Sequence, residues 1–238
     1  MKAIILAAGS GKRLQKASGG LPKSMIIIGG KTIMQRQIEA CRMQNIKDFV
    51  FVVGFKEDKL KSHIKSILKP DENAVFIRND IYNDTNTLYS LSLTTKEFTD
   101  DFIYFNADVV FMPEILSIIS KPSKYSELLL ETKKCGEEEV KMIIDDDYNI
   151  LQIGKKLPIS ECKGEFIGVG KFNKEILPIF EKHLKKAIDE KIGYTTFFEY
   201  AVDTMAKEVT LKAVSTNDIP CIEIDFPEDL EMAKKMFD

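Results

Sequence analysis

The first eighty residues of the chain alternate between short apolar runs and amphipathic segments. The apolar runs at residues 3–8, 49–54 and 74–77 have the length and the β-branched or aromatic character of buried strands. Between them, residues 32–45 and 56–68 place apolar side chains at helical spacing. This order builds a parallel sheet with helices on both faces. The sequence therefore predicts an α/β fold whose ligands bind beyond the carboxyl ends of the strands.

The first apolar run ends in a loop that combines glycine with positive charge. Residues 9–13 are Gly-Ser-Gly-Lys-Arg, and another cation, Lys23, follows Pro22. Glycine permits a close backbone approach, so N–H groups and nearby cations can hold a phosphate. A P-loop would need a glycine at position 6 and a hydroxyl at position 13, and a dinucleotide fingerprint would need a glycine at position 14. The sequence meets neither pattern, so the loop predicts a nucleoside triphosphate-binding site of another kind.

The same stretch carries a longer pattern. Residues 6–14 are Leu-Ala-Ala-Gly-Ser-Gly-Lys-Arg-Leu, followed by Pro-Lys at 22–23. A plain turn between a strand and a helix would explain the glycines but neither the cations nor the Pro-Lys. The pattern closely resembles the signature of the nucleoside triphosphate transferase family, which makes nucleotide-activated sugars and alcohols. The resemblance implies that Arg13 and Lys23 are catalytic. It also implies a nucleotide-binding set of Leu6, Ala7, Ala8, Gly9, Ser10, Gly11 and Lys12.

The polar segment at residues 79–91 also resembles a segment of this family. Its composition alone predicts a solvated loop followed by a helix cap. It resembles the N-x-x-Y-x-x-T-N-x-x-Y-S-L run of cytidylyltransferases for phosphocholine, 2-aminoethylphosphonate and inositol phosphate. It is less similar to the Gln-Pro-x-Gly segment of sugar-1-phosphate uridylyl- and thymidylyltransferases. The resemblance places Thr85 and Asn86 on the nucleotide side of the site and favours CTP.

Two aspartates are candidate ligands for Mg²⁺. Asp108 ends the apolar segment 101–108, close to Asn106, and a carboxylate there suits a cation bound to nucleotide phosphates. A cap on the following helix is the alternative. In the resembling family, a C-terminal E-I-D-x-x-x-D-L stretch opposes this strand-end aspartate across Mg²⁺. The resemblance therefore implies Asp108 and Asp225 as metal ligands, with Asn106 on the nucleotide side.

The second half of the chain is expected to bind the acceptor. Residues 164–172 resemble a strand that lines the acceptor pocket of the cytidylyltransferases, where Glu165 would attract a cationic amine. Glu165 is otherwise a polar residue at the start of a strand. Glu199 and Asp203 lie four residues apart on a predicted helix and resemble the acids of the family's Y-Y-E-D segment. They would approach the acceptor or form a solvated face.

The remaining predicted elements complete the α/β pattern. They are helices at 88–98, 113–120, 173–188 and 195–205, strands at 101–108, 126–131 and 164–172, a hairpin joining 142–144 to 150–153, and a strand and a helix after residue 220. The aromatic residues at 197, 198 and 200 are predicted to lie in the core.

Length and composition bound the remaining possibilities. The 238 residues predict one domain, with a nucleotide-binding half at 1–125 and an acceptor-binding half at 126–238. A net charge of −3 gives no case for nucleic acid or an anionic membrane, and no apolar run reaches the ~20 residues that span a bilayer. Scattered cysteines and the absence of signal-peptide anatomy predict a cytoplasmic protein. A homodimer is left open.

These features together predict a Mg²⁺-dependent cytidylyltransferase with a Rossmann-like, mostly parallel sheet and a small acceptor-binding extension. A phosphate or phosphonate monoester, phosphocholine or 2-aminoethylphosphonate foremost, would attack the α-phosphorus of CTP and release pyrophosphate. A sugar-1-phosphate uridylyl-, thymidylyl- or guanylyltransferase is the second enzyme hypothesis. A catalytically silent nucleotide sensor is the hypothesis of a different class.

Overall fold

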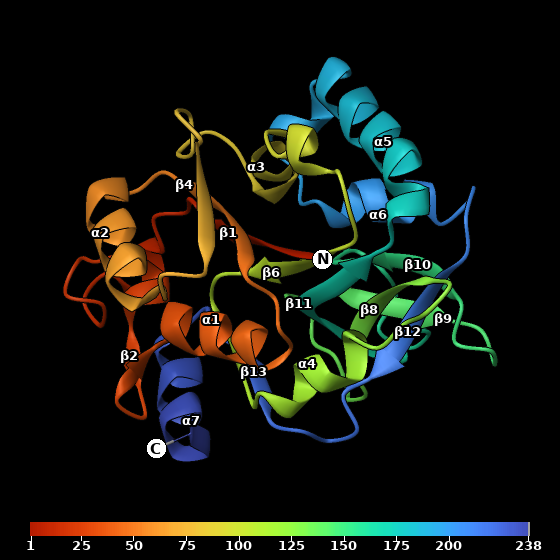
Figure 1. Ribbon diagram of the computed structural model, residues 1–238. Coiled ribbons are helices and arrows are strands. Elements are labelled where there is room, and N and C mark those ends of the chain that lie inside the picture. Colours follow the sequence, from red (N-terminus) through yellow and green to blue (C-terminus); the bar gives the residue numbers. More distant parts are fainter. Residues whose placement is uncertain (238) are drawn as a thin grey trace.

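A nine-stranded sheet runs through the part of the chain that the computed structural model describes, residues 1–237 (Figure 1). Its first half is parallel, with β6, β1, β4 and β5 side by side in that order. Their bounds are β1 (Lys2–Ala7), β4 (Asp48–Val53), β5 (Asn73–Arg78) and β6 (Phe102–Asn106). These are the strands that the apolar runs predicted, and the α/β fold is confirmed.

The second half of the sheet is built mainly from antiparallel pairs. It comprises β8 (Ser126–Glu131), β9 (Lys141–Ile144), β10 (Ile150–Gly154), β11 (Gly164–Phe172) and β12 (Leu211–Ser215). The long strand β11 joins the two halves, because its later residues pair with β6 and its first residues with β9 along one edge, while β8 pairs along the other edge. Strands β9 and β10 form the predicted hairpin. Strand β12, which the sequence analysis did not predict, runs parallel to β8.

Helices cover both faces of the sheet, as predicted. On β1, Ile4 and Leu6 point to one face and Ala3 and Ile5 to the other, as the period of a strand requires. The first face is covered by α3 (Thr87–Ser92), α5 (Leu177–Asp189) and α6 (Glu199–Met205). The second is covered by α1 (Ile33–Met43), α2 (Glu57–Ile67) and α4 (Glu114–Ile119). None of the helices described is long and apolar enough to cross a membrane.

Two small antiparallel pairs lie outside the main sheet. They are β2 (Ile27–Ile28) with β3 (Lys31–Thr32), and β7 (Val109–Phe111) with β13 (Cys221–Glu223). Strand β13 brings the C-terminal acidic motif to the end of β6, where Ile224 N donates to Asp108 O at 3.1 Å. The chain then enters α7 (Pro227–Phe237), whose apolar side packs against Ile28 and Ile33. Residues 108 and 225 are therefore neighbours in space.

Three predicted helices are shorter than expected. The helix at 195–205 begins only at Glu199, because Phe198 N donates to the Thr87 hydroxyl instead of continuing a helical ladder. The helix at 88–98 ends at Ser92 and gives way to a 3₁₀ turn. The helix at 173–188 begins at Leu177, one residue before a proline that suits a first turn.

Candidate active site

One cavity of about 260 Å³ lies beyond the carboxyl ends of β1 and β6, where the fold predicted a ligand site. The predicted site residues that line it are Leu6, Ala7, Gly9, Gly11, Lys23, Asn86, Asn106, Asp108, Glu199 and Asp225. Side chains not predicted for the site complete the lining, among them Ser24, Thr87, Val140, Lys155, Phe197 and Glu223. The cavity therefore joins segments from both halves of the chain.

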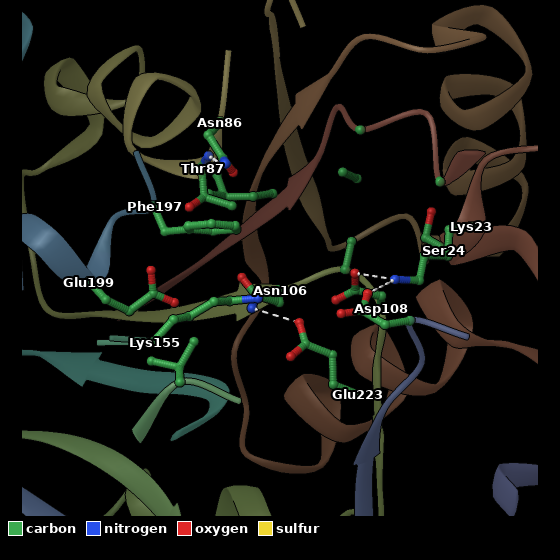
Figure 2. A pocket seen from close by; sticks show the side chains of 17 residues that line it. Lys23, Ser24, Asn86, Thr87, Asn106, Asp108, Lys155, Phe197, Glu199 and Glu223 are labelled. Atoms are coloured by element: carbon green, nitrogen blue, oxygen red, sulfur yellow. Dashed lines mark hydrogen bonds and ion pairs between the residues drawn. The ribbon is translucent and has the colours of Figure 1, made fainter. Parts of the chain in front are cut away.

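Lys23 lies between two carboxylates at one end of this cavity. Its Nζ donates to Asp108 Oδ2 at 2.8 Å and to Asp225 Oδ1 at 2.7 Å, the two bonds drawn to its ammonium in Figure 2. The glycine loop reaches this point because Gly11 adopts left-handed backbone, with a φ of 54°. A Cβ at Gly11 would lie 3.1 Å from the Cβ of Lys23, so a larger residue would crowd the lysine.

The two carboxylates keep Lys23 charged. Burial by itself would lower the pKa of the Lys23 ammonium, but the attraction of Asp108 and Asp225 outweighs burial and raises this pKa above its ordinary value. Burial would likewise raise the pKa of the Asp225 carboxyl, and Lys23 reverses that effect and lowers it. The Lys23–Asp225 pair is therefore ionised at neutral pH.

Glu223 supplies a third carboxylate at the same end. Its Oε1 accepts a hydrogen bond from Asn106 Nδ2 at 3.1 Å (Figure 2). One oxygen each from Asp108, Glu223 and Asp225 lies within 4.8 Å of the others. Burial and the charges of the two aspartates raise the pKa of Glu223 well above its ordinary value.

This group of three carboxylates fits a hard divalent cation. Mg²⁺ takes oxygen ligands, and carboxylates are the protein oxygens it binds most readily. Asp108 Oδ1 is buried and has no hydrogen-bond partner among residues 1–237, so one acceptor atom there is unsatisfied. A cation would satisfy it and offset the mutual repulsion of the acids.

The opposite end of the cavity combines an aromatic ring with an unpaired acid. Phe197 is 38% exposed and lies near Glu199, which is only 4% exposed (Figure 2). Glu199 Oε2 has no hydrogen-bond partner within the described chain. Burial raises the pKa of Glu199 to about 7, against the opposing influence of its own backbone N–H and of Lys155. Lys155 Nζ lies 4.8 Å from the centre of the Phe197 ring.

Several residues predicted as nucleotide-binding, and one predicted as catalytic, Arg13, do not line the cavity. They are Ala8, Ser10, Lys12, Arg13 and Thr85. Arg13 is exposed, with its guanidinium carbon 4.6 Å from the centre of the Phe226 ring. The Thr85 hydroxyl is engaged within its own loop, where it donates to Ile81 O and accepts from Asn79, each at 3.0 Å. Asn86, next to it, does line the cavity while also capping α3.

Two of the three predicted acceptor residues also lie away from the cavity lining. Glu165 is 8% exposed, and its carboxylate pairs with Lys133 Nζ at 2.5 Å. Asp203 Oδ1 accepts from Ile153 N at 3.0 Å, which ties α6 to β10. Both acids thus have partners inside the protein, and Glu199 alone of the three is presented to the cavity.

Some of the cavity residues that were not predicted carry a signal in the sequence, and others carry none. Glu223 and Asp225 are two residues apart, so a strand would have placed them on one face, and the motif could have suggested both. Phe197 was assigned to the core with its neighbours. Phe198 is fully buried, whereas Phe197 lines the cavity. No sequence pattern marked Lys155, which reaches the cavity only through the antiparallel half of the sheet.

The fold is that of the nucleotidyltransferases. Residues 3–119, just under half of the chain, match the model of the MobA-like NTP transferase domain. Cytidylyltransferases are among the chain's relatives. The CTP:phosphoglutamine cytidylyltransferase of Campylobacter jejuni is 28% identical over an alignment of length 258, which covers 98% of each chain.

Two further comparisons show how far the likeness extends. The bifunctional protein GlmU of Methanocaldococcus jannaschii is 30% identical over 184 residues, which span 76% of this chain but only 42% of that protein. Among solved structures, the CTP:phosphocholine cytidylyltransferase of Streptococcus pneumoniae superposes with a TM-score of 0.82, at 22% identity, over 99% of this chain and 98% of that one. This last likeness shows the shared fold.

Proposed function

We propose that this chain is a Mg²⁺-dependent cytidylyltransferase that joins CTP to a small phosphate or phosphonate monoester and releases pyrophosphate. The observation that carries the proposal is the grouping of Lys23 with Asp108 and Asp225 beside the glycine loop. A lysine and carboxylates brought together from three distant segments suit a reaction between two highly charged phosphates.

The reaction needs no nucleophile from the protein. An oxygen of the acceptor phosphate forms a bond to the α-phosphorus of CTP, and the bond from that phosphorus to the oxygen bridging the α- and β-phosphates breaks. Pyrophosphate leaves with the electron pair of the broken bond. Catalysis then rests on positioning and charge neutralisation. Lys23 would contact the α-phosphate and the incoming acceptor, while Arg13 and the backbone of residues 9–11 would hold the β,γ-phosphates.

The proposed Mg²⁺ would be held by Asp108, Asp225 and Glu223. When bound, it would neutralise charge on the phosphates as the new bond forms. The protein's own part is to fix the three carboxylates and to supply Lys23 as a further cation. Glu223 thus extends the aspartate pair that the sequence motif suggested.

CTP is the proposed nucleotide on two grounds. Asn86, from the segment that resembles the cytidylyltransferases, lines the cavity, and its amide could bond to a base edge. A relative that spans nearly the whole chain is a cytidylyltransferase.

An amine-bearing acceptor is favoured by the far end of the cavity. The unpaired, buried Glu199 offers a negative charge, and Phe197 offers an aromatic face, which together suit an ammonium group. Phosphocholine and 2-aminoethylphosphonate carry such a group at a short distance from the phosphorus.

Pyrophosphate release tests this proposal directly. The protein is incubated with Mg²⁺, one of CTP, UTP, dTTP or GTP, and one of phosphocholine, 2-aminoethylphosphonate, inositol phosphate or a hexose 1-phosphate. Release with CTP and an amine-bearing acceptor is expected. Release only with a hexose 1-phosphate would rule out the proposed acceptor. The proposed class of reaction, nucleotidyl transfer, would still stand. Nucleotide binding without release for any pair would favour a silent sensor.

Substitution of Lys23 separates its proposed role from simple nucleotide binding. Lys23→Met is expected to lower kcat by about 100-fold or more, as does loss of one transition-state donor, with a smaller effect on nucleotide affinity. The matched control is Lys31→Met, since Lys31 is exposed and pairs with Glu39. Steady-state kinetics and equilibrium CTP binding supply the two readings. Equal losses in kcat and affinity would argue against the role.

A further inference from the structure

The turn that carries Asp108 is held from behind by a buried side chain. Gln37, on α1, is fully buried, and its Nε2 donates to Asn106 O and to Val109 O, each at 2.9 Å. These two carbonyls stand on either side of Ala107 and Asp108. One amide group therefore spans the base of the turn between β6 and β7.

The same turn also sets the position of Glu223. The Asn106 side chain donates to Glu223 Oε1, while its backbone carbonyl accepts from Gln37. Val109, the other carbonyl that Gln37 contacts, pairs with Glu223 in the β7–β13 ladder. Gln37 thus contacts both residues through which the turn is joined to Glu223.

The chemistry of this contact calls for a donor of glutamine's length. Both neighbours are carbonyl acceptors in the interior, where an unpaired backbone carbonyl is costly. An apolar residue of similar size would fill the space but leave both carbonyls without this donor.

We infer that Gln37 is a positioning residue for the metal centre: by bracing the Asn106–Val109 turn it fixes Asp108 and, through Asn106, Glu223. This inference rests on the proposed function, because that function assigns the carboxylates to Mg²⁺. Groups that orient metal ligands typically change metal affinity or activity by about 10- to 100-fold when they are removed. Gln37 lines no part of the cavity, so its effect must pass through the turn.

The experiment measures metal binding directly, with Mn²⁺ as the probe and electron paramagnetic resonance as the readout, with and without CTP. Gln37→Met is expected to weaken Mn²⁺ binding by about 10- to 100-fold and to raise the metal concentration for half-maximal activity in parallel. The KM for the acceptor is expected to stay within about twofold, because Glu199 lies at the other end of the cavity.

Two control variants separate positioning from general stability. Gln35→Met makes the same chemical change on the same helix, but the Gln35 side chain donates to Glu39 and not to the turn. Ile38→Val removes a buried methyl group beside Gln37 and lowers the melting temperature, but it leaves both Gln37 hydrogen bonds to the turn in place. Both are expected to bind Mn²⁺ as the wild type does.

The outcomes distinguish the inference from the function on which it rests. A Gln37→Met protein that melts earlier yet binds Mn²⁺ like the wild type would overturn the positioning role. A wild type that binds no Mn²⁺ would overturn it as well. If the wild type binds Mn²⁺ but releases no pyrophosphate with any substrate pair, the proposed reaction fails. Weaker Mn²⁺ binding by Gln37→Met would still support the positioning role of Gln37 in that case.

Discussion

At the scale of single residues, the site keeps a buried carboxylate that the fold does not pair. Glu199 is 4% exposed, and one of its oxygens lacks a partner in the described chain. Burial raises its pKa from the ordinary 4.5 to about 7. Between these two values the folded protein holds a proton that the unfolded chain releases, so Glu199 lowers stability as pH rises from about 4.5 to about 7. Above about pH 7 the carboxyl is ionised in both states, so the loss of folding free energy stays constant.

Glu199→Gln is therefore expected to stabilise the protein in one pH range only. Near pH 8 the variant should gain on the order of 2–3 kcal/mol, because it never has to bury a charge, and near pH 5 the gain should be small. Urea unfolding at the two pH values measures this difference. Glu181→Gln, at an exposed position on α5, serves as the control and should show no such dependence.

The same substitution should harm acceptor binding if the acceptor carries an amine. For the wild type, the KM for such an acceptor is expected to fall as pH rises through about 7, because the carboxylate becomes charged. Glu199→Gln should raise this KM by about tenfold or more and remove its pH dependence, since about 1.4 kcal/mol of lost attraction is a factor of ten. An unchanged KM would show that Glu199 does not contact the acceptor.

At the scale of elements, the long strand β11 closely approaches the turn that carries Asp108. Gly168 has a φ of 73°, and a Cβ added there would lie 2.8 Å from Asn106 Nδ2 and 2.9 Å from Val109 Cγ2. Only glycine allows this backbone to pass the turn that carries Asp108. The register of β11 on β6 and the position of the carboxylates are thus linked.

Gly168→Ala should damage both stability and turnover. Crowding in a packed site costs about 1–3 kcal/mol, and displacement of Asn106 should disturb its bond to Glu223. Gly30→Ala is the matched control, since Gly30 has a similar φ of 74° but an added Cβ would meet nothing within 4 Å. Thermal melting and kcat are measured for both. Equal losses in the two variants would mean that backbone strain alone matters at residue 168.

At the scale of the whole molecule, the two halves of the chain share one sheet and the apolar clusters on its faces. Strand β11 from the second half pairs with β6 from the first. The apolar cluster on one face mixes Ile4, Val50 and Leu88 with Phe180 and Val202. The cavity likewise takes side chains from both halves.

A chain cut after residue 125 should therefore not fold on its own. It would expose the edge of β6 and lose the side chains that cover one face of the parallel strands. Near-ultraviolet circular dichroism and urea unfolding of residues 1–125 should show no fixed aromatic environment and no cooperative transition. The full chain should unfold in one cooperative step. A cooperatively folded fragment would establish two domains in place of the predicted one.

Much of this molecule follows from its sequence because the relevant physics is local. Apolar runs alternating with helical patterns specified the parallel strands and their covering helices, since burial imposes those periods on any chain. The glycine loop with Lys23 was recognisable because phosphate binding restricts both residue type and spacing. The aspartates at 108 and 225 were singled out with the help of the family resemblance, and the structure places both beside Lys23.

What the tertiary structure alone decided is which polar side chains face the cavity and which are used inside the fold. Glu165 and Asp203 resemble acceptor residues in sequence, yet Lys133 and the Ile153 amide engage them. Glu199 remains without such a partner. Glu223 and the buried Gln37 acquire their places through β13 and the β6–β7 turn. A hydrogen-bond partner distant in the chain leaves no trace in local periodicity, so the assignment of each acid had to await the packed structure.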